Sequence, residues 1–185
     1  MEVLPHYNVI VEGKRLRRYK VLILGESGVG KTAMIMKIIH GRDYLLDGGQ
    51  QPSLGVDFFN IITEDKVFQV WDTEGKQDYK GSTLSIFRLA ELVLYCYDIT
   101  RKETLDAITK HRKTFLHNRQ STDPNCCSGI LVGLKSDLPG RQVSTEQGEE
   151  LALKMGLMFI EYSLILDDPK IMIKKMEEAL DKAKF

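Results

Sequence analysis

The stretch YKVLILGESGVGKT, residues 19–32, decides the fold of this chain. Its first half is short and almost wholly apolar, as expected of a β-strand that is buried on both faces of a sheet. The apolar run ends at Gly25, and KTAMIMKIIHG (31–41) then has apolar residues at helical spacing with a glycine at its end. The segment between strand and helix fits the pattern G-x-x-x-x-G-K-[ST], which is typical of a phosphate-binding loop.

The residue types of this loop suit phosphate binding. Its glycines let successive backbone N–H groups turn toward phosphate oxygens, and the helix N-terminus adds partial positive charge. Lys31 would span the β- and γ-phosphates, and Thr32 would offer its hydroxyl to Mg²⁺. An ordinary glycine turn is the alternative, which the flanking strand and helix disfavour. The predicted nucleotide contacts of the loop are Gly25, Glu26, Ser27, Gly28, Val29, Gly30, Lys31 and Thr32.

Apolar runs alternate with helical segments along the rest of the chain. VDFFNIIT (56–63) and VFQVWDT (67–73) are separated only by EDK, which predicts an antiparallel hairpin. Three further strand candidates are LVLYCYDIT (92–100), GILVGLK (129–135) and MGLMFIEYS (155–163). This alternation predicts an α/β fold of six strands, five parallel and one antiparallel, with helices on both faces of the sheet.

Capping residues and apolar spacing predict where helices begin and which face they bury. Thr100 with Glu103, and Ser144 with Gln147, have the spacing of capping boxes. DPKIMIKKMEEALDKAKF (168–185) carries Asp and Pro ahead of a helical run. The residues expected on its buried face are Met172, Met176, Ala179 and Leu180.

The composition fits one globular domain in a reducing compartment. The chain has 185 residues, 43% of them hydrophobic, and its 26 basic and 26 acidic residues cancel, so no overall field favours nucleic acid or an acidic membrane. Its three cysteines form no disulfide framework, because Cys96 lies in an apolar run and Cys126 and Cys127 are adjacent. No apolar stretch approaches the roughly 20 residues that cross a bilayer. We therefore expect a cytoplasmic protein.

Residues 1–18 have no clear period, and we expect an N-terminal extension there, ahead of one domain at 19–185. The run GKRLRR (13–18) carries four cations, which favour a solvated basic arm over a lipid-binding patch. Because no cysteine follows Cys127, we expect no membrane anchor in this chain.

Taken together, these motifs resemble the small GTPases of the Ras superfamily, and most of all the Rab proteins. Beyond GESGVGKT, the resemblance rests on four segments: LGVDF (54–58), similar to the Rab switch I signature, WDTEG (71–75), VGLKSDL (132–138), similar to the guanine-reading segment, and RQVSTEQGEELALKMGLMFIEYS (141–163). It implies the P-loop small GTPase fold, GTP or GDP with Mg²⁺ as ligands, and effector and regulator proteins as partners through residues 43–59 and 74–88. The expected molecule is a monomer that binds no nucleic acid and reaches vesicle membranes only through partners.

The resemblance also assigns roles around the phosphates. Thr32 and Ser53, the latter where the family normally has threonine, would ligate Mg²⁺, and Asp72 would hold it through a water. The backbone N–H of Gly75 would meet the γ-phosphate. Tyr44 would pack on the base or ribose, although a plain exposed tyrosine remains open there.

The base-reading motifs depart from the family pattern. Lys135 would stack its stem on the base, and Asp137 would accept hydrogen bonds from N1–H and the 2-amino group of guanine. Leu134 stands where the family has asparagine, which removes an amide that would contact the base and brace the phosphate loop. Ser163 matches the first residue of the family's final base-reading motif, and the backbone N–H of the next residue, Leu164, could still reach the base oxygen. We expect the affinity to be lower by up to about tenfold, with guanine preference kept.

The second switch segment (switch II, residues 74–88) also departs from the family pattern, so no catalytic residue is intact. Lys76 replaces the usual glutamine and Glu74 the usual alanine. A glutamine accepts from the attacking water and donates to phosphate at once, whereas an ammonium only donates. The resemblance thus implies a GTP/GDP switch of the GTP hydrolase class with very slow intrinsic hydrolysis. A pseudo-GTPase scaffold, one domain of a longer tandem protein, is the alternative, and a P-loop ATPase or kinase is disfavoured by Lys135 and Asp137.

Overall fold

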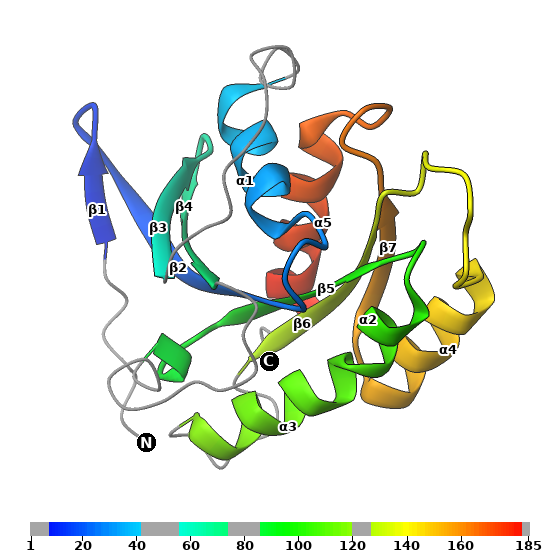
Figure 1. Ribbon diagram of the computed structural model, residues 1–185. Coiled ribbons are helices and arrows are strands. Elements are labelled where there is room, and N and C mark those ends of the chain that lie inside the picture. The colour runs from blue at the N-terminus through cyan, green and yellow to red at the C-terminus, as the bar shows by residue number, and fades with distance from the viewer. Residues whose placement is uncertain (1–7, 42–55, 74–85, 120–126, 183–185) are drawn as a thin grey trace.

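The computed structural model of the protein describes residues 8–41, 56–73, 86–119 and 127–182, and a single sheet forms its centre (Figure 1). The strand order is β3-β4-β2-β5-β6-β7, and β1 pairs with β2 outside this path. The strands are β1 (Asn8–Val11), β2 (Lys14–Leu24), β3 (Val56–Ile62), β4 (Lys66–Thr73), β5 (Leu92–Asp98), β6 (Ser128–Leu134) and β7 (Met158–Tyr162). The helices are α1 (Lys31–His40), α2 (Lys102–Asp106), α3 (Ile108–Asn118), α4 (Thr145–Met155) and α5 (Pro169–Lys182).

The predicted α/β fold is confirmed, with one strand more than expected. Five strands run parallel, and β3 pairs antiparallel with β4 as the EDK turn predicted. The additional strand, β1, pairs antiparallel with the start of β2. Glu12 and Gly13 turn the chain between them, both with positive φ (48° and 78°), as a type I′ hairpin requires.

The basic run GKRLRR was wrongly predicted to be a solvated arm. Apart from its first residue it belongs to β2, which begins at Lys14. The guanidinium of Arg17 lies 4.4 Å from the centre of the Tyr19 ring and 3.3 Å from the carboxylate of Glu91. The sequence pattern did not reveal this half of the strand, because its cations obscure the alternation of apolar and polar residues.

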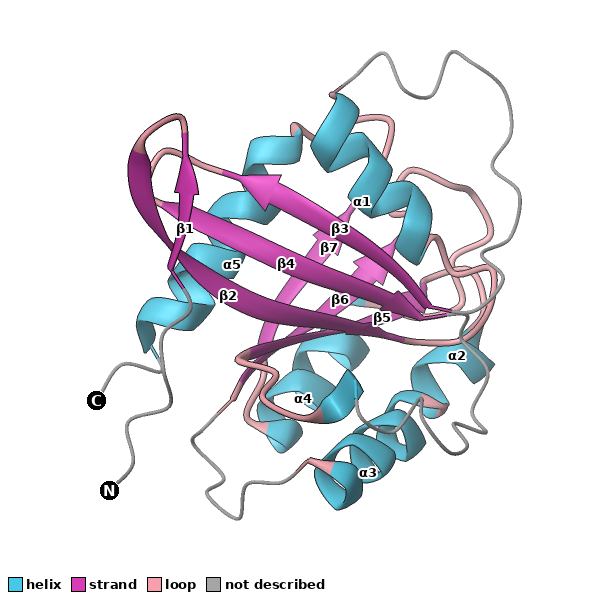
Figure 2. Cartoon of the chain, turned by 90° about the vertical axis from the view of Figure 1, so that its left-hand side faces the viewer, coloured by secondary structure: helices cyan, strands magenta, loops and turns pink. Residues whose placement is uncertain are grey.

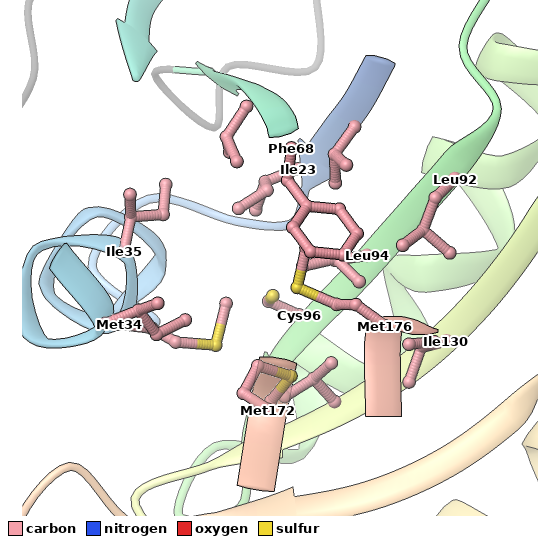
Figure 3. Packing of buried hydrophobic residues seen from close by; sticks show 14 of the residues in the cluster. Ile23, Met34, Ile35, Phe68, Leu92, Leu94, Cys96, Ile130, Met172 and Met176 are labelled. Atoms are coloured by element: carbon pink, nitrogen blue, oxygen red, sulfur yellow. The ribbon is translucent and has the colours of Figure 1, made fainter. Parts of the chain in front are cut away.

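Helices cover both faces of the sheet (Figures 1 and 2). On the face of α1 and α5, Ile23, Phe68 and Met176 belong to a continuous core (Figure 3), and the four predicted face residues of α5 are all buried. The helices α2, α3 and α4 lie on the other face. Every residue of β5 is buried, and its side chains alternate between the two cores. This is the double burial expected of a central parallel strand.

One of the two predicted capping boxes is present. Ser144 accepts from the backbone of Gln147, whose side chain accepts from the Ser144 N–H in return. The predicted box at Thr100 is wrong, because α2 has Arg101 as its N-cap residue without a side-chain cap. The Thr100 hydroxyl instead donates to Oδ1 of Asp98 at 2.6 Å. In a capping box the hydroxyl oxygen accepts from a backbone N–H of the helix, whereas here the hydroxyl donates to a buried carboxylate in a charge-assisted hydrogen bond.

Candidate functional site

The predicted site residues that the structure describes gather at the carboxyl ends of the parallel strands. The phosphate loop follows β2, Asp72 is the penultimate residue of β4, Leu134 ends β6, and Ser163 follows β7. Asp98, Leu134 and Tyr162 are direct partners across β5, β6 and β7. Ligands of open α/β sheets bind in the crevice outside these strand ends.

The backbone of the phosphate loop requires its glycines. Gly25, Gly28 and Gly30 have φ values of 151°, 75° and 108°. A Cβ on Gly25 would lie 2.1 Å from the carbonyl oxygen of Cys96, so only glycine fits against β5. The helix α1 then begins with no side-chain cap and no acidic residue in its first turn. The partial positive charge of this helix N-terminus therefore favours an anion there.

Lys31 lies over the same loop. Its Nζ donates to the carbonyl oxygens of Gly25 at 3.0 Å and Glu26 at 2.9 Å, and the residue is 5% exposed. Burial lowers the pKa of Lys31, while the charge of Asp72 acts in the opposite direction. An ammonium held in this way gains from a nearby phosphate, because the anion compensates for its desolvation.

Thr32 and Asp72 provide oxygen atoms beside the loop that fit a magnesium ion. The Thr32 hydroxyl donates to Oδ2 of Asp72, and Asp72 is fully buried. Its Oδ1 is buried without a hydrogen-bond partner among the described residues. Burial raises the pKa of Asp72, against the hydrogen bond from Thr32 and the charge of Lys31. A hard cation that takes carboxylate, hydroxyl and water oxygens suits this pair.

Lys135 is tied to the phosphate loop. It has a positive φ of 67°, and its Nζ donates to the Gly28 carbonyl at 3.1 Å and to Oδ2 of Asp98 at 2.5 Å. Asp137 lies in the turn that follows, and its carboxylate makes no hydrogen bond or ion pair with any described residue, as base recognition requires. Leu134 is fully buried, and its Cδ1 lies 3.6 Å from the position of a Cβ on Gly30. It therefore packs beneath the phosphate loop as an apolar support.

Asp98 braces the loop, and the sequence analysis did not identify it. Besides Lys135 it accepts from the backbone N–H of Thr100 at 2.9 Å and from Nε of Arg101 at 3.3 Å. Arg101 in turn donates to the Ser27 carbonyl at 3.2 Å. Burial acts to raise the pKa of Asp98, but the hydrogen bonds from Lys135 and Thr100 outweigh it, and the pKa lies below its usual value. The sequence signal that could have identified Asp98 is a carboxylate at the carboxyl end of a buried strand.

A second unpredicted contact joins α3 to the phosphate loop. Nε2 of His111 lies 3.0 Å from Oε1 of Glu26, and His111 is only 1% exposed. Burial lowers the pKa of His111 despite the opposite effect of the Glu26 carboxylate. The Glu26 carboxylate can only accept, so Nε2–H of His111 is the donor, and α3 is tied to a residue of the loop itself.

The segment after β7 is folded on itself around Ser163. Its Oγ accepts from the N–H groups of Ile165 and Leu166 at 3.1 and 2.9 Å, and its own N–H donates to Oδ2 of Asp167 at 2.7 Å. The N–H of Leu164 makes no hydrogen bond with the described residues. This is the donor that was predicted to meet the base oxygen.

The other predicted site residues lie outside the described residues. They are Tyr44, Ser53, Gly75 and Lys76, together with Glu74. The described ranges contain no group of three side chains able to hold a metal ion, and the predicted third ligand, Ser53, is not among them. The assignments around the γ-phosphate therefore remain predictions.

These features together define a phosphate-loop nucleotide-binding domain: the glycine loop, the buried Lys31, the pair of Thr32 and Asp72, and the two base-side segments. The family model for the Ras family matches residues 20–175. The Ras-related protein SEC4 of Saccharomyces cerevisiae is 34% identical over 154 residues, which cover 80% of this chain and 68% of that protein. The chain belongs to the Ras family, as a divergent, Rab-like small GTPase with the expected P-loop GTPase fold.

Proposed function

We propose that this chain is a switch that binds GTP or GDP together with Mg²⁺. The observation that carries this proposal is the pairing of the Thr32 hydroxyl with the buried Asp72 carboxylate, beside Lys31 and the uncapped start of α1. These residues would hold the metal ion and the β- and γ-phosphates. When bound, Mg²⁺ would neutralise charge on the phosphate oxygens. Ser53 and the Gly75 N–H would complete the contacts on the γ-phosphate side.

Guanine is the proposed base. Lys135, held against the phosphate loop, would present its stem to one face of the ring. The carboxylate of Asp137, which has no partner among the described residues, would accept from N1–H and the 2-amino group, donors that adenine does not present in this arrangement. Leu134 supplies no amide, so a modest loss of affinity is expected while the choice of base is kept.

Hydrolysis by this chain is proposed to be very slow. The Lys76 ammonium has no lone pair with which to orient the attacking water, and Glu74 adds negative charge near the triphosphate. The same two residues support the second candidate, a pseudo-GTPase scaffold that holds nucleotide without cycling. The two candidates differ in turnover when a cognate activating protein is added.

Effector and regulator proteins are the proposed partners, bound through residues 43–59 and 74–88, in vesicle trafficking or signalling. In the described part of these ranges, Phe58 is 44% exposed, and its ring packs edge-on against Trp71 at 5.2 Å. We propose a cytoplasmic monomer that meets vesicle membranes through such partners. The described residues include no helix with the length and apolarity to cross a membrane.

Extraction of bound nucleotide from the purified protein, followed by chromatography, tests this function. GTP or GDP is expected in nearly stoichiometric amount, with release promoted by EDTA. A bound adenine nucleotide, or equal competition by ATP and GTP for the emptied site, would contradict guanine recognition. No bound nucleotide, with no binding on addition of GTP and Mg²⁺, would contradict the switch altogether.

A further inference from the structure

Lys37, in the middle of α1, is a buried cation with a fixed place. The residue is 1% exposed, and its Nζ donates to the carbonyl oxygens of Leu164 and Asp167, the latter at 2.7 Å. The same ammonium lies 5.7 Å from the centre of the Tyr162 ring. Burial of an ammonium is unfavourable unless hydrogen bonds and nearby electron density compensate. Here both come from one segment, the end of β7 and the residues directly after it.

That segment is the one that presents the Leu164 N–H. Its internal hydrogen bonds, between Ser163 and the backbone of Ile165 and Leu166 and between Asp167 and Ser163, give it a shape of its own. They do not fix where it lies relative to the phosphate loop. Pairing of β7 with β6 fixes where the segment starts, and the two bonds from Lys37 tie the residues after Ser163 directly to α1.

The bonds come from α1, which begins at the phosphate site. Lys31 and Thr32 form the first turn of α1, and Lys37 follows Lys31 by six residues, about 9 Å along the helix axis at 1.5 Å per residue. One helix therefore joins the phosphate contacts to the segment on the base side. Leu134 ends β6, the strand beside β7, and it has no side-chain amide with which to make such a link.

We propose that Lys37 is a positioning residue for recognition of the guanine base. It fixes residues 163–167, and with them the Leu164 N–H, at the distance from the phosphate loop that a bound guanine nucleotide spans. This inference rests on the proposed function, since it concerns the base end of the same site. Removing the ammonium leaves the carbonyls of Leu164 and Asp167 without this donor, so the segment shifts relative to α1. The strength of a hydrogen bond falls steeply with misalignment, and the contact to the base oxygen weakens.

The test compares the affinities for GDP and ADP, measured with Mg²⁺ by displacement of a fluorescent guanine nucleotide. Lys37→Met keeps the length of the side chain and removes its charge and donors. We expect GDP affinity to fall by about five- to tenfold, the value of roughly one hydrogen bond, while ADP affinity is unchanged. Lys37→Arg keeps a cation with several donors and should restore most of the preference for GDP. The control is Lys170→Met, the same change at an exposed lysine three residues after Asp167, which should alter neither affinity.

Two outcomes overturn the inference alone: a GDP to ADP preference in Lys37→Met equal to that of the wild type, or an equal loss for both nucleotides. Equal loss would mean that Lys37 acts through α1 or through general stability, and not on the base. If Lys37→Met does not fold, Lys37→Gln carries the same comparison, because its shorter amide reaches one carbonyl at most. A smaller fall in the preference is expected there, and the wild-type preference would overturn the inference. Wild-type protein that binds neither nucleotide would overturn the proposed function, and this inference with it.

Discussion

At the scale of single residues, Lys31 has the clearest consequence. Its ammonium is buried over the carbonyls of Gly25 and Glu26, where the phosphates are expected. Lys31→Ala removes the positive charge that compensates the triphosphate, so we expect GTP and GDP binding to fall below detection in a calorimetric titration. Lys154→Ala, at an exposed position of α4, is the control. Unchanged affinity in Lys31→Ala would refute the phosphate site.

Leu134→Asn should separate stability from binding. The introduced amide can contact the base and brace the loop, so GTP affinity should rise by up to about tenfold. Leu134 is also fully buried in the core below Gly30, and exchanging it for a polar residue of smaller volume should destabilise the nucleotide-free protein by about 2–4 kcal/mol. Denaturant unfolding without nucleotide measures the second effect, and a titration with GTP measures the first. A drop in both quantities would show that the amide finds no partner.

The residues of the site divide by whether local sequence identifies them. Lys31 and Thr32 were predicted because the loop, the strand before it and the helix after it are contiguous in the chain. Asp98 and Lys37 were not predicted, since the acceptor or donor of each lies on a distant segment. Lys135 follows Asp98 by 37 residues, and Asp167 follows Lys37 by 130. Such contacts arise only when parallel strands bring their carboxyl ends to one edge.

At the scale of elements, the burial of His111, on α3, makes stability depend on pH. Burial lowers the folded-state pKa of His111, whereas an unfolded histidine titrates near about 6.5. Below that pH the unfolded state binds the extra proton first, so this residue lowers the free energy of unfolding as the pH falls from about 6.5 toward the folded-state pKa.

His111→Gln tests this effect, because glutamine can still bond with Glu26 and does not titrate. We expect the free energy of unfolding to fall less between pH 7.5 and pH 5.5 in this variant than in the wild type, as measured by denaturant titration at both pH values. The other histidines and the carboxylates are common to both proteins and cancel in the comparison. Equal losses in the two proteins would show that His111 keeps its usual pKa in the fold.

The helices and strands also show where apolar patterns and capping motifs predict the structure correctly. The patterns of β5 and α5 predicted their burial correctly, because each is decided by contact with the sheet or the core along its whole length. The cap at Ser144 was predicted correctly, whereas the Thr100 hydroxyl donates to Asp98, two residues before it, a partner that the capping-box pattern does not include. The hairpin of β1 and β2 was missed because its cations obscure the alternation of a strand.

At the scale of the whole molecule, binding and turnover depend on different parts of the chain. The described parts of the phosphate and base sites come from loops at the ends of β2, β4, β6 and β7, with buried support from β5, α1 and α3. They use neither the side chain of Glu74 nor that of Lys76. Turnover in this family requires, in addition, a group on switch II that aligns the attacking water, and we propose that Lys76 stands at its position. We therefore expect GTP binding to be retained while hydrolysis is very slow.

Single-turnover hydrolysis measures that separation directly. We expect the wild type to hydrolyse bound GTP more slowly than Ras, whose intrinsic rate is roughly 3–5 × 10⁻⁴ s⁻¹. Lys76→Gln with Glu74→Ala should raise the rate, because the amide can accept from water and donate to phosphate, and because the added negative charge is removed. GTP affinity should change little, since neither side chain is needed to hold the phosphates. If the wild type already reaches the rate of Ras, or if the double variant gains nothing under saturating Mg²⁺, Lys76 does not limit the chemistry, and a group outside switch II must supply or block the alignment of water.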